Sequence, residues 1–437
     1  MSERVESRPL MRGAATLAGV ADILKMNAAP AVFPSLAQLP RLLAAAPHRL
    51  LFFAGASSVM VSMTWWTSVL LSSRMGLEFP AAPVPAGWAH AVLTQYGMLS
   101  MFIFGFLLTV FPRWLNQPAL TRRHYVPVFA GVFGGYLLAH AGLLDMKPLL
   151  LVGLASMLCG WLVGLITLGR VLLRSRSRDR FAWSCYAAVS IGACGLAAFV
   201  AFALGAPWWM AVVAIKLGTF GLLVPIYVTV CLRMIPFFSA NVVGHGYRKF
   251  QPAWTLPLMW FLLVAHCAAE LAHRFAGLWL LDVPLAILFA TLWWGWQPWK
   301  CLKPGLLAAL YLAFAWLPVA FALFAAQSLI LAISGQFVLG RAPVHALTIG
   351  FFGSMLVAMV TRVTMGHSGR PLQMGAIAWL TFGALQLAAV ARIAAELSPD
   401  AGAWLIAAAF GWLLAFAPWI ARTLWIYFTP RVDGHPG

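Results

Sequence analysis

Charged residues are scarce in this sequence, and acidic residues are the scarcest of all. Only 9% of its 437 residues are charged, and Asp and Glu together number 11. Because a soluble protein carries roughly 25% charged residues, this scarcity argues against a water-soluble domain. Hydrophobic residues make up 62% of the chain, more than one water-soluble core can hide. The composition therefore predicts that lipid surrounds most of the protein.

Several motifs of soluble enzymes are also missing. The six cysteines include no pair at CxxC spacing, so we expect small apolar core residues and no disulfide framework. The sequence has no P-loop, no dinucleotide-binding glycine pattern and no hydrolase constellation. ATP-driven pumping by this chain alone is therefore not expected.

What is present is a series of apolar runs of about twenty residues, each long enough to cross about 30 Å of hydrocarbon as a helix. They predict an all-α polytopic membrane protein with about twelve transmembrane helices. The runs are 49–72, 88–112, 126–145, 149–173, 181–204, 207–232, 253–273, 278–298, 305–328, 343–362, 373–396 and 402–427. We expect a basic cytoplasmic N-terminal tail at 1–47 without a signal peptide, a transmembrane domain at 48–428 and a cytoplasmic C-terminal tail at 429–437.

The net charge of +18 comes mainly from Lys and Arg in the short segments between the apolar runs. With the N-terminus in the cytoplasm, only Arg74, Lys147, Arg274 and Arg341 fall on the outer side, and nearly all the others fall on the cytoplasmic side. This asymmetry predicts a bacterial cytoplasmic (inner) membrane protein with both termini in the cytoplasm. It favours contact with anionic lipids at the cytoplasmic face over nucleic-acid binding.

Two histidines open predicted helices at the same depth. His90 begins the helix at 88–112 and His345 begins the helix at 343–362, so both lie near the outer leaflet. Such a pair could ligate one metal or the two axial faces of a haem. Each could equally hydrogen-bond a neighbouring helix, as histidines in membranes often do. Three further histidines, His140, His266 and His273, also fall toward outer helix ends.

Ionisable residues inside predicted helices are costly and often functional. Arg392 and Glu396 lie four residues apart in the helix at 373–396, so they can pair on one helix face. Lys216, in the helix at 207–232, has no partner nearby in the sequence, and its role stays open.

Three predicted helices end alike at the cytoplasmic side. They read GFLLTVFPRW (105–114), CLRMIPFFSAN (231–241) and MVTRVTMGHSGRP (359–371), with four helices per step, which is compatible with three arcs of four helices. Their polar residues form a candidate cytoplasmic cluster. It could hold an anion or haem propionates, or it could cap helix ends. Its members are Arg113, Arg233, Asn241, Arg362, His367 and Arg370.

Three segments carry a resemblance to a known family: HAVLTQYGMLSMFIFGFLLTVFPRW (90–114), RMIPFFSAN (233–241) and HALTIGFFGSMLVAMVTRVTMGHSGRPL (345–372). On these residues the chain resembles the NnrS family, membrane proteins associated with the response to nitric oxide and described as haem- and copper-containing. The resemblance implies haem b, nitric oxide as a ligand or substrate, and copper. The chain departs from a His-x-His-Glu pattern, because Val92 and Leu93 replace the second His and the Glu, which removes two potential copper ligands.

The chain is also distantly similar to the catalytic subunit of haem-copper oxidases, which has twelve helices in three arcs of four. That similarity implies that His90 and His345 are axial haem ligands and that Arg341 pairs with a haem propionate. It does not extend to the oxidase copper site, because the stretch 207–232 contains no histidine and 253–273 contains no His-His pair.

Three functions remain open. The first is a haem-b membrane protein that binds, senses or turns over nitric oxide, or transfers electrons. The second is a transporter of a small molecule or metal complex, in which Lys216 or the arginines contact an anion. The third is a non-catalytic membrane scaffold for another metalloprotein. Only the first requires a chromophore. The sequence identifies no protein partner and does not decide whether the chain is an enzyme.

Overall fold

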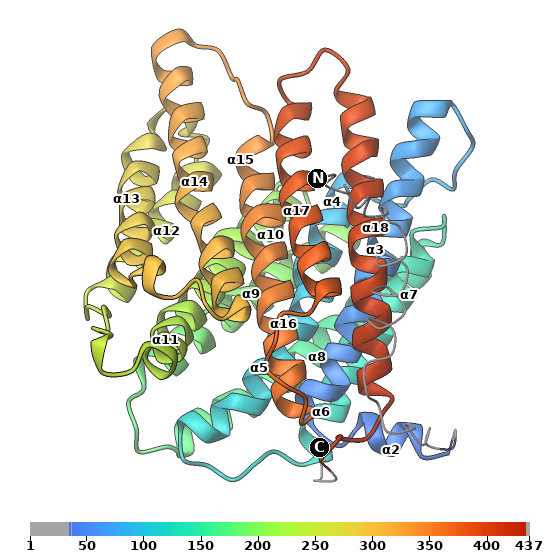
Figure 1. Ribbon diagram of the computed structural model, residues 1–437. Helices are drawn as coiled ribbons and strands as arrows, with labels where there is room; N and C mark the ends of the chain where they lie inside the picture. Colours follow the sequence, from blue (N-terminus) through green and yellow to red (C-terminus); the bar gives the residue numbers. More distant parts are fainter. Residues whose placement is uncertain (1–34, 36, 434–437) are drawn as a thin grey trace, which may run out of the picture.

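The computed structural model describes residues 35 and 37–433, and every regular element in this part of the chain is a helix (Figure 1). The all-α prediction is thereby confirmed. Residues 1–34, 36 and 434–437, which hold most of the predicted N-terminal tail and the end of the predicted C-terminal tail, lie outside the described residues. A short helix, α2 (Leu39–Leu43), precedes the first span.

Twelve apolar helical spans follow at the predicted places. The first six are α3 (Pro47–Met75); α4 (Ala86–Val92), η1 (Leu93–Met98) and α5 (Leu99–Trp114); α6 (Arg122–Phe129), η2 (Ala130–Gly134) and α7 (Gly135–Gly142); α8 (Lys147–Arg174); α9 (Arg180–Ala203); and α10 (Trp209–Lys216), η3 (Leu217–Leu223) and α11 (Val224–Val243). The last six are α12 (Thr255–Leu271); α13 (Trp279–Gly295); α14 (Gly305–Ser334); α15 (Ala342–His345), η7 (Ala346–Gly353) and α16 (Ser354–His367); α17 (Ala376–Ala395); and α18 (Ala401–Tyr427).

Several spans differ in length from the prediction. Eleven spans are long and apolar enough to cross a membrane, whereas α12 has 17 residues and would span about 25 Å. The sixth span runs past its predicted end at 232 as far as Val243, because Pro236 does not stop the helix. It ends where Gly244 adopts a φ of 71°, a conformation that glycine reaches without strain.

The contacts between neighbouring spans recur every four spans along the chain. The pairs α8–α9, α13–α14 and α18–α3 join successive groups of four spans, and the last pair closes the bundle. The second, sixth and tenth spans are the most enclosed of the eleven long spans, with 83%, 72% and 72% of their most apolar stretch buried, against 61% or less for the other eight. Side chains of these three spans, among them Phe102, Tyr227 and Met355, line one apolar cavity of about 70 Å³. They therefore form the centre of the bundle.

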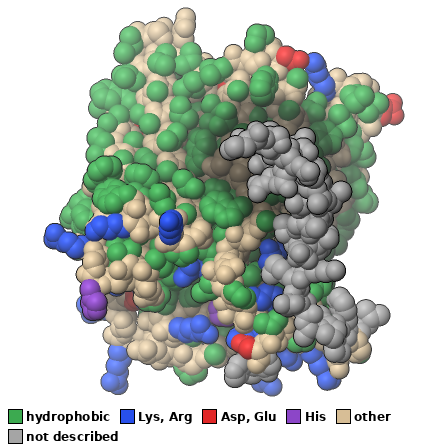
Figure 2. Space-filling model, viewed as in Figure 1, with side chains coloured by type: hydrophobic (Ala, Val, Ile, Leu, Met, Phe, Trp, Pro, Cys, Tyr) green, Lys and Arg blue, Asp and Glu red, His purple; other side chains and the backbone are tan. Residues whose placement is uncertain are grey.

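The two ends of the bundle differ in charge. At one end, which we call the basic end, Arg233 near the end of the sixth span packs over Trp114 at the end of α5 and pairs with Asp179 before α9. At the other end, Arg74 at the end of α3 pairs with Asp400 before α18. Figure 2 shows Lys and Arg gathered over the lower part of the molecule. These contacts bring together helix ends that the predicted alternation places on the same side.

The outer surface of the bundle is apolar (Figure 2). Large hydrophobic side chains point outward along the helices, including Ile333, Leu387 and Phe261, whose exposed fractions are 79%, 73% and 68%. A soluble monomer rarely exposes so much contiguous apolar area. The chain is therefore a multi-pass membrane protein in contact with lipid.

Candidate functional site

Three histidines lie at the end of the bundle opposite the basic end, which we call the histidine end. His90 is in α4, His345 closes α15, and His140 is in α7. The side chain of His90 is near enough to His140, Arg341 and His345 for their charges to act on it. The two histidines singled out in the sequence thus belong to one neighbourhood, and His140 joins them. The close packing of α7 on α8 fixes its position, since a Cβ on Gly153 would lie 2.3 Å from the Ala139 nitrogen.

The ring of His345 is oriented by its own backbone. Its Nδ1 lies 2.9 Å from the Arg341 carbonyl oxygen. A carbonyl oxygen can only accept, so Nδ1 must carry the proton and donate it. Nε2 is then an unprotonated acceptor, which is the arrangement of a histidine that ligates a metal.

The other two histidines also have a ring nitrogen that lacks a partner among the described residues. His140 Nδ1 donates to the Tyr136 carbonyl oxygen over 3.1 Å, which leaves its buried Nε2 without a hydrogen bond. His90 stacks on Trp66 with ring centroids 4.4 Å apart, and its buried Nδ1 has no hydrogen-bond partner. Because buried polar atoms are nearly always paired, these nitrogens are open to a partner from outside the described side chains, such as a ligand or a water molecule.

These histidines could hold a haem but do not form a polydentate metal site. No group of three or more His, Cys, Asp or Glu in the described part of the chain converges to hold a metal ion. Axial ligation of a haem requires only one imidazole on each face of the ring. His90 and His345 each offer a ring nitrogen without a hydrogen-bond partner among the described residues, which is the donor type that axial ligation uses. The side chain of Arg341 has no ion pair among the described residues, which leaves its charge available to an anionic group.

Each of the three central spans carries one candidate functional residue, and a π-helical segment follows that residue in all three. η1 begins three residues after His90, η3 directly after Lys216, and η7 directly after His345. Such segments are rare in proteins, and those that occur are often found at functional sites. Here they also bring spans together, since Gln95 in η1 donates a 2.9 Å hydrogen bond to Thr219 in η3.

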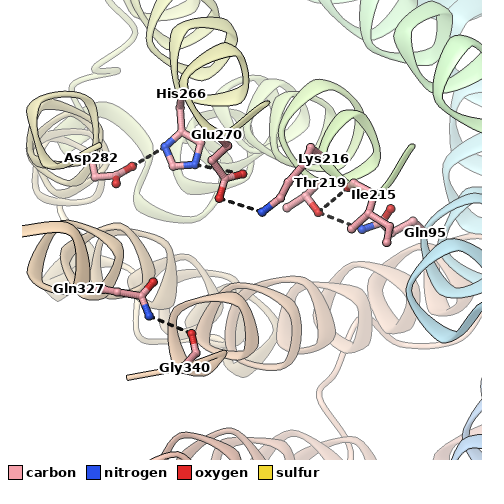
Figure 3. Close-up of polar contacts among 9 residues, drawn as sticks. All are labelled: Gln95, Ile215, Lys216, Thr219, His266, Glu270, Asp282, Gln327 and Gly340. Atoms are coloured by element: carbon pink, nitrogen blue, oxygen red, sulfur yellow. Dashed lines mark hydrogen bonds and ion pairs between the residues drawn. The ribbon is translucent and has the colours of Figure 1, made fainter. Parts of the chain in front are cut away.

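Lys216 has a partner that no sequence pattern indicated. Its Nζ lies 2.8 Å from Glu270 Oε1 in α12. Behind Glu270, the ring of His266 lies 2.7 Å from Asp282 in α13, and both His266 and Asp282 are fully buried (Figure 3). We call Lys216, Glu270, His266 and Asp282 the acid–histidine chain. The signal available in the sequence was the presence of Glu270 and Asp282 inside apolar runs.

A cavity of about 660 Å³ opens beside this chain at the histidine end. Its ionisable lining includes Lys216 and Glu270, Arg341, and the Arg392–Glu396 pair, whose closest atoms are 2.6 Å apart as the four-residue spacing predicted. We call it the outer cavity. It places Lys216 and Glu270, at one end of the acid–histidine chain, and Arg341 on the wall of the same space.

The candidate cytoplasmic cluster falls into separate contacts at the basic end. Arg233 pairs with Asp179, Arg362 lies 3.6 Å from the centre of the Phe238 ring, and Arg370 lies 5.3 Å from that of Trp425. Burial and the nearby Arg422 lower the pKa of Arg370 below its usual value. The side chain of Asn241 is exposed.

A histidine pair that sequence reasoning missed lies among these residues. The rings of His367 and His48, from the end of α16 and the start of α3, have centroids 4.0 Å apart. The exposed Arg113 is near enough for its charge to act on both rings. This positive surrounding disfavours a cation at the His48–His367 pair.

Comparison with models of protein families shows which family the chain belongs to. The model described as NnrS protein matches residues 42–431, which is nearly the whole chain. Comparisons with curated proteins and with solved structures found no match. The distant similarity to haem-copper oxidases therefore gains no support from a solved structure. The matched region includes all twelve spans, the histidine end and the basic end, and the chain belongs to the NnrS family.

Proposed function

We propose that this protein holds a haem b at the histidine end, with His90 and His345 as axial ligands, and acts in the nitric-oxide response. The observation that carries the proposal is the state of the two imidazoles. His345 has its Nδ1 proton committed to the Arg341 carbonyl and its Nε2 free, and His90 has a buried nitrogen without a partner. Both rings sit at the starts of central spans, next to π-helical segments.

The residues around the two histidines have defined parts in this proposal. The stacked Trp66 restricts rotation of the His90 ring, and the Arg341 carbonyl holds the His345 ring in one tautomer. The Arg341 guanidinium would bind a propionate, because its charge has no protein partner in the described chain. A bound haem would supply an iron that binds nitric oxide or passes an electron.

The proposal does not extend to copper. The described residues offer no group of three metal-binding side chains, and Val92 and Leu93 stand where two further ligands could have been. Copper content is nonetheless measured beside iron in the experiment below, because the family resemblance implies it.

The experiment that tests the proposal is the visible spectrum of the full-length protein, purified in mild detergent from haem-replete cells. We expect a Soret band, sharp α and β bands after dithionite, and about one iron per chain. A spectral shift on adding nitric oxide would identify a reactive haem, and no shift would identify an electron carrier. A colourless, iron-free preparation would contradict the proposal and leave transport or scaffolding as the function.

We further propose that the basic end faces the cytoplasm of a bacterial inner membrane, with the predicted tails and anionic lipid headgroups on that side. The support is the concentration of Lys and Arg at one end of the bundle (Figure 2). The histidine end then faces outward.

The orientation can be measured with single cysteines in exposed segments at the two ends. With the exposed Cys159 and Cys194 replaced by alanine, we expect a membrane-impermeant maleimide to label Glu78→Cys in intact spheroplasts. The same reagent should label Ser177→Cys only in inside-out vesicles. The reverse pattern would overturn the orientation.

A further inference from the structure

Four ionisable side chains form a continuous chain across three helices inside the membrane-spanning part of the protein (Figure 3). Lys216 comes from α10, His266 and Glu270 from α12, and Asp282 from α13. Ionisable groups at such positions are expensive to bury, and chains of Asp, Glu and His in membranes commonly carry protons.

The acid–histidine chain begins at the outer cavity and ends at side chains that solvent does not reach. Lys216, with 26% of its side chain exposed, and Glu270, with 6%, border the cavity, whereas His266 and Asp282 are inaccessible. The rings of Phe220, Phe321 and Phe324 surround His266, with the Phe220 centroid 4.2 Å from that of the imidazole. Water therefore reaches this chain from the cavity side.

The spacing of the chain suits stepwise proton transfer. His266 Nδ1 lies 2.7 Å from Asp282 Oδ1, and His266 Nε2 lies 3.8 Å from Glu270 Oε2. The second distance is about 0.6 Å longer than the longest ordinary N–H···O hydrogen bond. A small rotation of the Glu270 carboxylate, or one bridging water, would connect the two groups. Among the described residues, Glu270 Oε2, both ring nitrogens of His266 and both carboxylate oxygens of Asp282 lack an aligned hydrogen bond, so His266 and Asp282 meet as a close ion pair whose groups need only a small rotation to align.

Charge balance favours one extra proton in the chain. With Lys216 charged, both carboxylates ionised and His266 neutral, the four groups carry one net negative charge in an apolar surrounding. The helices packed against them add the thiol of Cys267 in α12 and the uncharged Gln327 and Ser328 in α14. The other charges on the cavity wall are those of Arg341, Arg392 and Glu396. A proton bound by His266 and Asp282 would neutralise the chain.

We propose that the acid–histidine chain takes up one proton from the outer cavity and stores it on the His266–Asp282 pair. The proton passes from cavity water to the Glu270 carboxylate and then to His266 Nε2. The proton already on Nδ1 moves to the Asp282 carboxylate. The net result is a neutral imidazole protonated on Nε2, a protonated Asp282 and an unchanged Lys216–Glu270 ion pair. The site thus serves as a proton reservoir for the outer cavity, whether or not a haem is bound beside it.

The test is infrared spectroscopy of the full-length protein in lipid nanodiscs. Between about pH 5 and pH 8, we expect wild type to show a carboxyl C=O band that loses intensity as pH rises and shifts in D₂O. The band should be absent from Asp282→Asn and retained in Asp145→Asn, a matched change at an exposed aspartate. In Glu270→Gln, deuterium should reach the remaining carboxyl at least about tenfold more slowly, because the first acceptor is gone.

Each result decides the proposal. A wild-type protein with no titrating carboxyl band in this window would overturn it, and so would a band that persists in Asp282→Asn. Deuterium exchange in Glu270→Gln as fast as in wild type would remove Glu270 from the path. If Asp282→Asn does not fold, the wild-type titration and the Glu270→Gln exchange rate still test the reservoir. None of these readouts depends on a bound haem, so the reservoir and the haem proposal can fail independently.

Discussion

Replacing His345 with alanine should lower the haem content of the purified protein at least about tenfold, as measured by the Soret band and by iron per chain. The reason is that His345 is the histidine whose ligating state the structure fixes most firmly, through the 2.9 Å hydrogen bond from Nδ1 to the Arg341 carbonyl oxygen. Alanine removes the ligand without adding bulk. His90→Ala should have the same effect, because a six-coordinate haem needs both axial imidazoles.

The matched control is His273→Asn. His273 lies at the same end of the bundle, is exposed, and has a φ of 55°, a conformation that asparagine tolerates well. This variant should retain the wild-type spectrum. Added imidazole should restore part of the absorbance of His345→Ala by entering the space left by the ring. A His345→Ala protein with full haem content would reject His345 as a ligand, and a loss in His140→Ala would then assign the role to His140.

Neutralising Lys216 alone should destabilise the protein far more than neutralising both members of its ion pair. In Lys216→Met, the Glu270 carboxylate, whose side chain is 6% exposed, would lose the lysine paired with it, at a cost of about 2–4 kcal/mol of unfolding free energy. This loss of unfolding free energy is smaller than the roughly 3–5 kcal/mol for breaking a fully buried ion pair, because Lys216 borders the outer cavity. In the double variant Lys216→Met, Glu270→Leu, both members of the ion pair are gone and neither is left unpaired, so most of the stability should return.

This comparison has a control at an exposed ion pair. Arg74 and Asp400 pair at 3.0 Å, but their side chains are 55% and 54% exposed. Arg74→Met should therefore change the unfolding free energy by no more than about 1 kcal/mol. Unfolding in SDS titrations, followed by tryptophan fluorescence, measures all three variants. A Lys216→Met effect no larger than that of Arg74→Met, or a double variant as unstable as the single one, would contradict the prediction.

Much of the architecture could be predicted because its causes are local. The hydrophobic runs placed all twelve helices, and the bias of Lys and Arg indicated which helix ends lie together. The contacts of Arg233 with Trp114 and Asp179 confirm that grouping at the basic end. The i, i+4 pairing of Arg392 and Glu396 was equally predictable, since one helical turn separates them.

The candidate site was only partly predictable. Matched depth brought attention to His90 and His345, and the structure places them in one neighbourhood. Depth along the helices could not indicate that the Arg341 carbonyl orients His345, that Trp66 stacks on His90, or that His140 lies near both. The partner of Lys216 was missed altogether, because Glu270 lies on another span and no short-range pattern connects the two.

The sequence by itself determined the membrane class and the places of the spans, because hydrophobicity acts residue by residue along the chain, and its three matched segments indicated the family. Only the tertiary structure decided which polar side chains meet. The physical reason is helix rotation: each residue turns the helix by about 100°, and a π-helical segment such as η3 or η7 changes the face that all later residues present. The acid–histidine chain and the outer cavity arise from that rotation, which a pattern of apolar residues does not record.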